Sequence, residues 1–213
     1  MTVASGRHRK ALSEYEVIVP LAFPRGQARN LARVRSTLIT ASLVAIRQMG
    51  WEERYYQALP PNKHDDLRSL VAGSWSSIEL ATAHYTACDK MGLTPAEMIS
   101  IGEDVSQRTQ KSFVATLARA SIEAGASPWI LFGTARRVWD RIFDGCDIAV
   151  YKVGPKEAYV EVVNCPLLAL PYFRAAFRAY FRTVVALLSK VVYTNEMTAY
   201  GTDSDAVFRF SWA

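Results

Sequence analysis

A histidine and a cysteine stand four residues apart in the stretch TAHYTACDK, at His84 and Cys88. In a helix, residues at i and i+4 lie on the same face. Such a pair suggests a bound metal or an activated thiol, but two ligands do not complete a zinc site. A half-buried histidine above a small core thiol is the alternative interpretation. His84 and Cys88 are our candidate ligand-binding residues, and we predict neither a metal site nor a catalytic residue there.

Two clusters of carboxylates also come into question for acid–base chemistry. His64-Asp65-Asp66 follows a Pro-Pro pair at the start of a predicted helix, where acidic residues favour the helix dipole. Glu103 and Asp104 are adjacent in a predicted helix and so point about 100° apart. The sequence contains no GxGxxG, GxxxxGK[ST] or GxSxG motif. Enzymatic activity is left open but not favoured, and we expect no cofactor.

The stretch YFRAAFRAYFR, residues 172–182, repeats a Phe-Arg pair every four residues. Its phenylalanines form one helical stripe that we expect to pack on a sheet. The arginines follow about 100° around the helix, at the edge of the stripe, where their stems can lie on apolar surface and their charged heads in water. This cationic rim is a candidate site for an anionic partner, formed by Arg174, Arg178 and Arg182.

The composition indicates an ordinary globular protein. Of the 213 residues, 50% are hydrophobic and 21% are charged, and the net charge is +5. An excess of basic residues near the N-terminus accounts for this charge. The three cysteines form no CxxC pair, which predicts a reduced, cytoplasmic chain. No secretory signal or transmembrane segment is expected, because arginines interrupt the longest apolar helix.

The order of elements predicts an α+β fold. We expect a flexible basic tail over residues 1–13 and one domain over 14–213, mainly helical over 30–145 and ββαββ over 146–213. EYEVIVPLAFP predicts a short strand or an extended strap, and Thr94 with Glu97 predicts a capping box. The hairpin–long helix–hairpin order predicts a four-stranded antiparallel sheet backed by helices.

The last strand alternates between aromatic and mostly polar residues. Phe208, Phe210 and Trp212 share one face, while Arg209 lies on the other. We therefore predict that Trp212 is buried although it is the penultimate residue. Trp129 and Trp139 follow the apolar period of another helix, so we assign them to the core rather than to nucleic-acid stacking with Arg136, Arg137 and Arg141.

The C-terminal half resembles the ligand-binding fold of 4-vinyl reductase domains, heme-NO-binding-associated domains and TRAPP vesicle-tethering subunits. Over about residues 30–212 the chain is also similar to a bacterial, myxobacterial-type family of paralogues. The segments that carry this similarity include RSTLITASLVAIRQMG, WSSIELATAHYTACDKMGL, VWDRIFDGCDIAVYKVGPKEAYVEVVNCPLL and the terminal FRFSW.

The resemblance implies a ligand-binding domain that forms homodimers through helices. Bacterial heme-NO sensors use a helical histidine as iron ligand, a place that His84 would take. Their Tyr-x-Ser-x-Arg motif for the heme propionates is absent, so heme is not expected. Some TRAPP subunits carry a buried acylated cysteine, and nothing aligns Cys88 securely with it.

The sequence therefore favours a non-enzymatic cytoplasmic sensor, adaptor or assembly module. We expect it to bind a small apolar ligand and to form a homodimer, and a further protein partner is left open. One alternative is a tetrapyrrole-binding or other cofactor-binding, enzyme-like domain. A second alternative is a basic-armed, nucleic-acid-associated regulator, although we do not expect nucleic acid as the partner.

Overall fold

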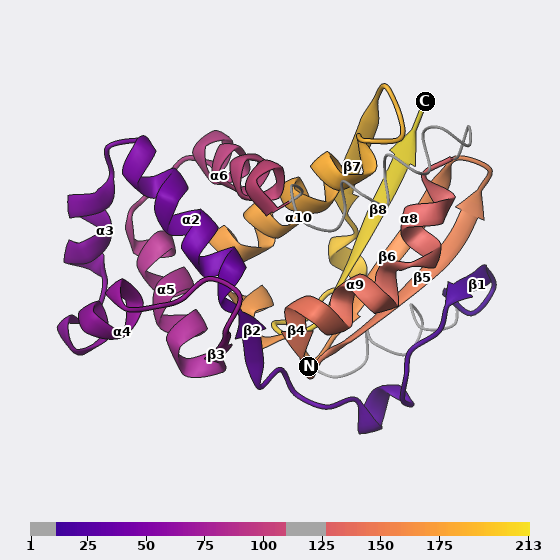
Figure 1. The fold of residues 1–213 in the computed structure, drawn as a ribbon. Coiled ribbons are helices and arrows are strands. Elements are labelled where there is room, and N and C mark those ends of the chain that lie inside the picture. Colours follow the sequence, from indigo (N-terminus) through magenta and orange to yellow (C-terminus); the bar gives the residue numbers. More distant parts are fainter. Residues whose placement is uncertain (1–11, 110–126) are drawn as a thin grey trace.

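A five-stranded antiparallel sheet and a block of helices lie side by side, with one long helix, α10, between them (Figure 1). The structure is a computed structural model and describes residues 12–109 and 127–213. The helical block consists of α2 (Ser36–Gln48), α3 (Glu52–Ala58), α4 (His64–Arg68), α5 (Ile78–Lys90) and α6 (Pro95–Thr109). The helices of the C-terminal half are α8 (Trp129–Gly133), α9 (Ala135–Ile142) and α10 (Pro171–Val185).

The large sheet has the strand order β1-β5-β6-β8-β7. Both predicted hairpins are present: β5 pairs with β6, and β7 pairs with β8, all antiparallel. The register shifts between Lys152 and Gly154, next to the predicted turn. The strands are β1 (Glu16–Val19), β5 (Asp147–Gly154), β6 (Glu157–Val163), β7 (Val192–Glu196) and β8 (Ala206–Trp212).

The prediction of a four-stranded sheet was wrong in the number of strands. β1 adds a fifth strand at the edge, where Glu16 pairs with Lys152 and Val17 with Tyr151. Its edge position suits a strand followed by Pro20, since proline cannot donate to a ladder. A second sheet has the order β3-β2-β4, in strands too short to show a period: β2 (Arg33–Arg35), β3 (Trp75–Ser77) and β4 (Phe143–Asp144).

One face of the large sheet packs on α8, α9 and α10. Phe208, Phe210 and Trp212 are buried in this core, which confirms the prediction for the last strand. Trp212 lies against Trp129 and Phe132 of α8, with ring centroids 5.1 and 5.4 Å away. Arg209 is on the opposite face, as predicted, where Nε donates to Glu157 at 2.7 Å.

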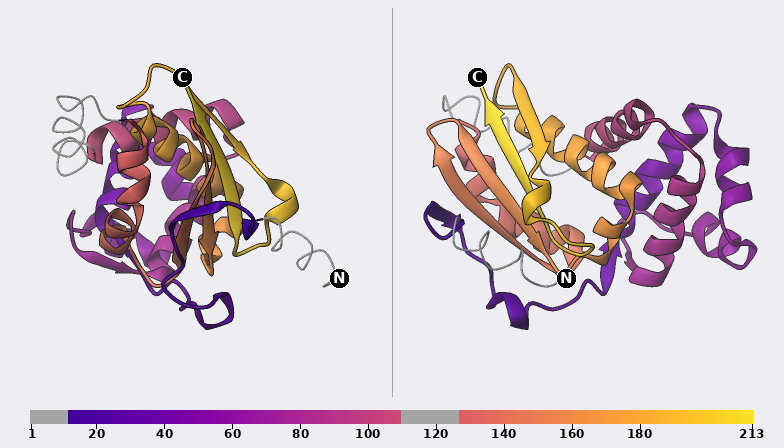
Figure 2. Two further views of the ribbon diagram at one scale, coloured as in Figure 1. Left: turned by 90° about the vertical axis from the view of Figure 1, so that its right-hand side faces the viewer. Right: turned by 180° about the vertical axis from the view of Figure 1, so that it is seen from behind.

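The N-terminal segment covers part of the opposite face and runs along the sheet toward the helical block (Figure 2). It is held by two buried acids of the sheet, Asp147 and Glu161. The backbone N–H of Ala22 donates to Asp147 at 2.8 Å, and Arg25 forms an ion pair with Glu161. Residues 1–11 of the predicted tail lie outside the described residues, whereas Leu12 is buried against the sheet.

The contact between α6 and α10 fixes the distance between the helical block and the sheet. The predicted capping box opens α6: the Thr94 N–H donates to Glu97 at 2.7 Å, and the Glu97 N–H donates to the Thr94 hydroxyl at 3.3 Å. Further along α6, Gly102 faces α10 so closely that a Cβ atom there would lie 2.3 Å from the carbonyl oxygen of Ala176. Only glycine permits this approach.

The variant Gly102→Ala tests this contact. The added methyl group meets backbone that cannot rotate away, so we expect a loss of about 1–3 kcal/mol of unfolding free energy, as in other overpacked cores. Gly133→Ala is the matched control, because nothing lies within 4 Å of a Cβ atom there. Urea unfolding should show a neutral or slightly stabilised control. Equal stability of both variants would contradict the close packing of α6 on α10.

Candidate ligand-binding site

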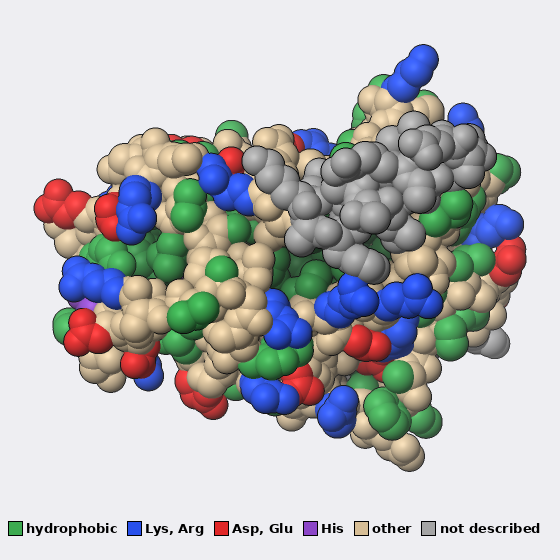
Figure 3. Space-filling model, viewed as in Figure 1, with side chains coloured by type: hydrophobic (Ala, Val, Ile, Leu, Met, Phe, Trp, Pro, Cys, Tyr) green, Lys and Arg blue, Asp and Glu red, His purple; other side chains and the backbone are tan. Residues whose placement is uncertain are grey.

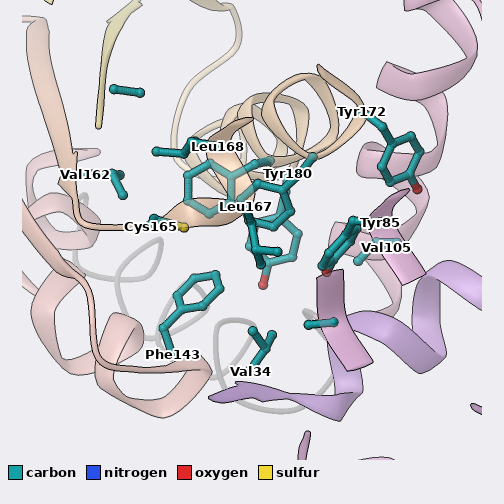
Figure 4. Packing of buried hydrophobic residues seen from close by; sticks show 14 of the residues in the cluster. Val34, Tyr85, Val105, Phe143, Val162, Cys165, Leu167, Leu168, Tyr172 and Tyr180 are labelled. Atoms are coloured by element: carbon teal, nitrogen blue, oxygen red, sulfur yellow. The ribbon is translucent and has the colours of Figure 1, made fainter. Parts of the chain in front are cut away.

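An apolar cavity of about 40 Å³, here called the inner cavity, lies between the helical block and α10. Figure 4 shows Tyr172 and Tyr180 projecting from α10, and Phe143 reaching toward the same helix. A volume of this size holds about three water molecules. Its described lining residues are Leu38, Ser42, Tyr85, Gly102, Val105, Ile142, Phe143, Tyr172, Phe173, Ala176, Phe177, Tyr180 and Phe181.

A second apolar cavity, the sheet-side cavity, also has a volume of about 40 Å³ and lies between α8, α9, α10 and the sheet. Ile142, Tyr180 and Phe181 line both cavities and so form the wall between them. Phe181 is only partly buried, unlike the other phenylalanines of its stripe. Phe181 thus stands between the two cavities. The remaining described lining residues include Leu131, Phe132, Val138, Trp139, Ile148, Val160, Val184 and Val185.

His84 and Cys88 lie together on α5, with His84 Nε2 3.9 Å from Cys88 Sγ. Both side chains are completely buried, so the expectation of a half-buried histidine was wrong. The other ring nitrogen, Nδ1, is 2.8 Å from the hydroxyl of Tyr55 on α3. A neutral imidazole has one donor nitrogen and one acceptor nitrogen. In His84 each of these two nitrogens contacts a protein group, Tyr55 or Cys88.

Cys88 connects this pair to the inner cavity. Its thiol lies near the side chains of Tyr172 and Ser42, whose hydroxyl oxygens lie 3.1 Å apart. A buried polar chain therefore runs from Tyr55 through His84 and Cys88 to the cavity wall. The sequence did not predict Tyr55, Ser42 or Tyr172, because these residues come from three different helices. Their one signal is that each occupies a buried position of its own helix.

The polar chain carries no charge at neutral pH. Burial lowers the pKa of His84 to about 3, and burial raises the pKa of the Cys88 thiol far above its ordinary value. Burial likewise raises the pKa of Tyr85 and of Tyr172. A neutral thiol is a poor nucleophile and a poor metal ligand. Within residues 12–109 and 127–213, no group of three His, Cys, Asp or Glu side chains is placed to hold a metal ion.

The candidate carboxylates are not brought together. Asp65 and Asp66 lie in the first turn of α4, as their position after Pro-Pro suggested, and His64 Nε2 contacts the carbonyl of Leu59 at 3.2 Å. Glu103 forms an ion pair with Arg182, whereas Asp104 binds Arg108 of its own helix. Asp66 is also paired, with Lys63, and none of these carboxylates belongs to the lining of the two cavities.

The three arginines of the cationic rim differ from one another. Arg174 Nε donates to the carbonyl of Leu168 at 2.7 Å, and Arg174 also forms an ion pair with Glu196. We had expected solvated guanidinium groups, and this expectation was wrong for Arg174. Arg182 is likewise paired, with Glu103. Arg178 is partly buried and has no ion pair within the part of the chain that the structure describes. A role for Arg174, Arg178 and Arg182 toward an anionic partner stays a proposal.

The aromatic residues near the other arginines belong to the core. Trp139 is buried, which confirms its core assignment. Trp129 is only partly buried: it packs against the core beside Trp212, and its indole N–H donates to the carbonyl of Pro155 at 2.8 Å. On the face in Figure 3, basic side chains are interspersed with acidic ones. These observations do not favour a nucleic-acid surface on that face.

Solved structures with the same fold are H-NOX domains. An H-NOX protein mutant from K. algicida in its Fe(II) unliganded form has a TM-score of 0.59 and 7% sequence identity, over 84% of this chain and 96% of that chain. An oxygen-binding H-NOX domain related to soluble guanylate cyclases, in its oxygen complex, has a TM-score of 0.52 and 12% identity, over 84% and 94%. The chain thus has the H-NOX fold.

The other comparisons give no relative. No protein-family model matches the sequence. No curated protein matches it either. In the described residues, no helix has the length and apolar composition that crossing a membrane requires.

The burial of His84 predicts a pH dependence of stability. In the unfolded chain the histidine binds a proton below its ordinary pKa of 6.5, whereas in the folded protein it stays neutral down to about pH 3. Its contribution is therefore complete above pH 6.5 and is lost as the pH falls toward 3. Between pH 7.5 and 5.0 we expect a loss of about 2 kcal/mol that His84→Gln does not show, measured by urea unfolding. Equal losses in both proteins would mean that His84 is accessible to protons.

Arg174 and Arg178 form a matched pair for a test of the rim. Arg174→Gln leaves Glu196 and two carbonyls without their partner, so we expect a loss of about 1–3 kcal/mol. Arg178→Gln should change stability by less than about 0.5 kcal/mol. Thermal unfolding of both variants at low and high salt measures the difference. A silent Arg174→Gln would show that this ion pair adds nothing to folding.

Proposed function

We propose that the protein is a non-enzymatic sensor or adaptor module that binds a small apolar ligand between the helical block and the sheet. The observation that carries the proposal is the pair of apolar cavities separated by Ile142, Tyr180 and Phe181. No Asp, Glu, Lys or Arg appears among the described residues that line them. Apolar pockets with a few polar groups are typical of small-molecule sites.

The fold likeness raises the alternative of a tetrapyrrole ligand, since the similar domains include heme proteins of the H-NOX family. The residues present do not fit a heme. The chain has three histidines, and no His lines either cavity among the described residues. His84 is fully buried with both ring nitrogens in contact with Tyr55 and Cys88. Segment 110–126, outside the described residues, contains no His, Cys, Met or Tyr.

Burial keeps the cavity tyrosines protonated as well, so they are poor anionic ligands for iron. Each cavity of about 40 Å³ is also far too small for a porphyrin. We therefore propose that this chain uses the H-NOX fold without heme. We expect hemin titration to give the same Soret absorbance for the natural protein and for His84→Gln. A Soret band that is lost in His84→Gln would contradict the proposal.

Further parts of the proposal rest on the sequence resemblance. We propose that the protein acts in the cytoplasm, forms a homodimer and shares an origin with 4-vinyl reductase and TRAPP-type domains. The order β5, β6, α10, β7, β8 supports this relation, because it is the ββαββ order on which the resemblance depends. Light scattering after size-exclusion chromatography measures the oligomeric state.

Toluene, with seven heavy atoms, is larger than either cavity alone, so as a probe it tests whether movement of the Phe181 ring joins the two cavities into one site. At ten times its dissociation constant, a ligand of the folded state adds about 1.4 kcal/mol. For a chain of this length, we expect an increase of the melting temperature by about 3–6 °C. Native mass spectrometry of the purified protein would, in addition, report a ligand that copurifies.

Two variants make the toluene experiment specific. Phe181→Ala removes the ring between the cavities and should increase the effect of toluene, whereas Val105→Phe should fill the inner cavity and abolish it. The proposal of an apolar site fails if toluene stabilises neither the natural protein nor Phe181→Ala.

A further inference from the structure

We infer that the hydroxyl pair of Ser42 and Tyr172 is the polar subsite of the inner cavity, and that the ligand is an uncharged alcohol or phenol. This inference rests on the proposed function and narrows the class of ligand. Ser42 comes from α2 and Tyr172 from the first turn of α10, so the pair joins the helical block to α10. Both residues line the inner cavity.

The pair is buried and held in place. Ser42 and Tyr172 are 3% and 1% exposed, and their oxygens are 3.1 Å apart. The Cys88 thiol of α5 lies near both, and His84 lies behind the thiol at 3.9 Å. The backbone N–H of Tyr172 also donates to Asp89 at 2.6 Å, which fixes the start of α10 on the end of α5. Both side chains therefore have a fixed position in the wall of the inner cavity.

The number of hydrogen-bonding groups leaves capacity for a ligand. Each hydroxyl has one donor and two acceptor positions, and either oxygen can donate in the contact between them. That contact uses one of the two hydrogens, and the thiol supplies only a weak donor and a weak acceptor. A ligand hydroxyl both donates and accepts, so it matches the pair in either orientation. A pure hydrocarbon leaves this capacity unused.

The other hydroxyls of the lining are Tyr85 and Tyr180. The Tyr180 hydroxyl accepts a hydrogen bond from Thr109 Oγ1 of α6 at 3.1 Å. Among the described residues it makes no hydrogen bond with the hydroxyl pair or with the Cys88 thiol, so it lies outside the pair. Tyr180 is therefore a control residue, with the same side chain in the same cavity but without the arrangement around Cys88. Tyr85 lies beside Tyr172, with ring centroids 6.2 Å apart, and serves as a check on the position of the subsite.

The lining also excludes charged ligands. Its described residues include no Lys, Arg, Asp or Glu, and His84 behind the pair is not protonated at neutral pH. An ionised ligand in this cavity would lose its hydration without gaining a counterion, which is strongly unfavourable. Carboxylic acids that are ionised at neutral pH should therefore be rejected, although their apolar parts would fit.

Three probes with the same ring separate these possibilities: toluene, phenol and benzoate. We would measure their affinities at pH 7.5 for the natural protein, Tyr172→Phe, Ser42→Ala, Tyr85→Phe and the control Tyr180→Phe. The quantity of interest is the ratio of phenol to toluene affinity, because toluene reports the apolar cavity alone. We expect this ratio to fall about fivefold in Tyr172→Phe and in Ser42→Ala, within the usual range for one buried hydrogen bond. Tyr180→Phe should leave it unchanged within about twofold.

The outcomes distinguish this inference from the proposed function. If toluene does not bind, the apolar site itself is wrong. If toluene binds but the ratio is unchanged in both Tyr172→Phe and Ser42→Ala, or falls instead in Tyr85→Phe, the hydroxyl pair is not the subsite. Binding of benzoate as tightly as phenol would overturn the conclusion that the ligand is uncharged. Should Tyr172→Phe not fold, Ser42→Ala decides the question alone.

Discussion

The packing of α10 between the sheet and the helical block is the constraint on which the rest of the structure depends. Phe177 lies within 6 Å of Trp139 on α9 and Phe208 on β8, at ring centroid distances of 5.9 Å in both contacts. On its other side, α10 meets α6 at Gly102, where no side chain fits. One helix thus packs against both layers, and both apolar cavities lie against it.

The buried polar chain gives this apolar interface a single orientation. Tyr55, His84 and Cys88 lead from α3 through α5 to Ser42 and Tyr172, and all of these groups are uncharged. Buried polar groups stabilise a fold only when they are hydrogen-bonded. The contacts along this polar chain therefore rigidify the packing of α2, α3 and α5 on α10. These contacts engage both ring nitrogens of His84, and on this observation the proposal of a site without heme depends.

The N-terminal segment is held on the sheet by ion pairs and hydrogen bonds to two buried carboxylates. Asp147 and Glu161 are almost fully buried, and they are neutralised by Arg136 and Arg25. Removing one partner of such a pair leaves a buried charge, which is why these contacts fix the segment on the sheet. The segment lies on the face of the sheet opposite the sheet-side cavity.

The sequence by itself determined the elements with a regular period or a local signal. The alternation of Phe208, Phe210 and Trp212 predicted the buried face of β8, and Thr94 with Glu97 predicted the start of α6. The four-residue spacing placed His84 beside Cys88. These features depend on residues close in the chain, whose geometry follows from the helix or strand that contains them.

Only the tertiary structure decided the fifth strand, the partners of the arginines and the candidate site. β1 joins an edge that lies more than a hundred residues away in the chain, and Arg174 finds Glu196 across the turn after α10. The inner cavity lies where α2, α5, α6 and α10 meet, and its proposed polar subsite unites Ser42 with Tyr172. No local pattern encodes these contacts, because side chains from separate elements become neighbours only after the apolar faces of those elements have packed together.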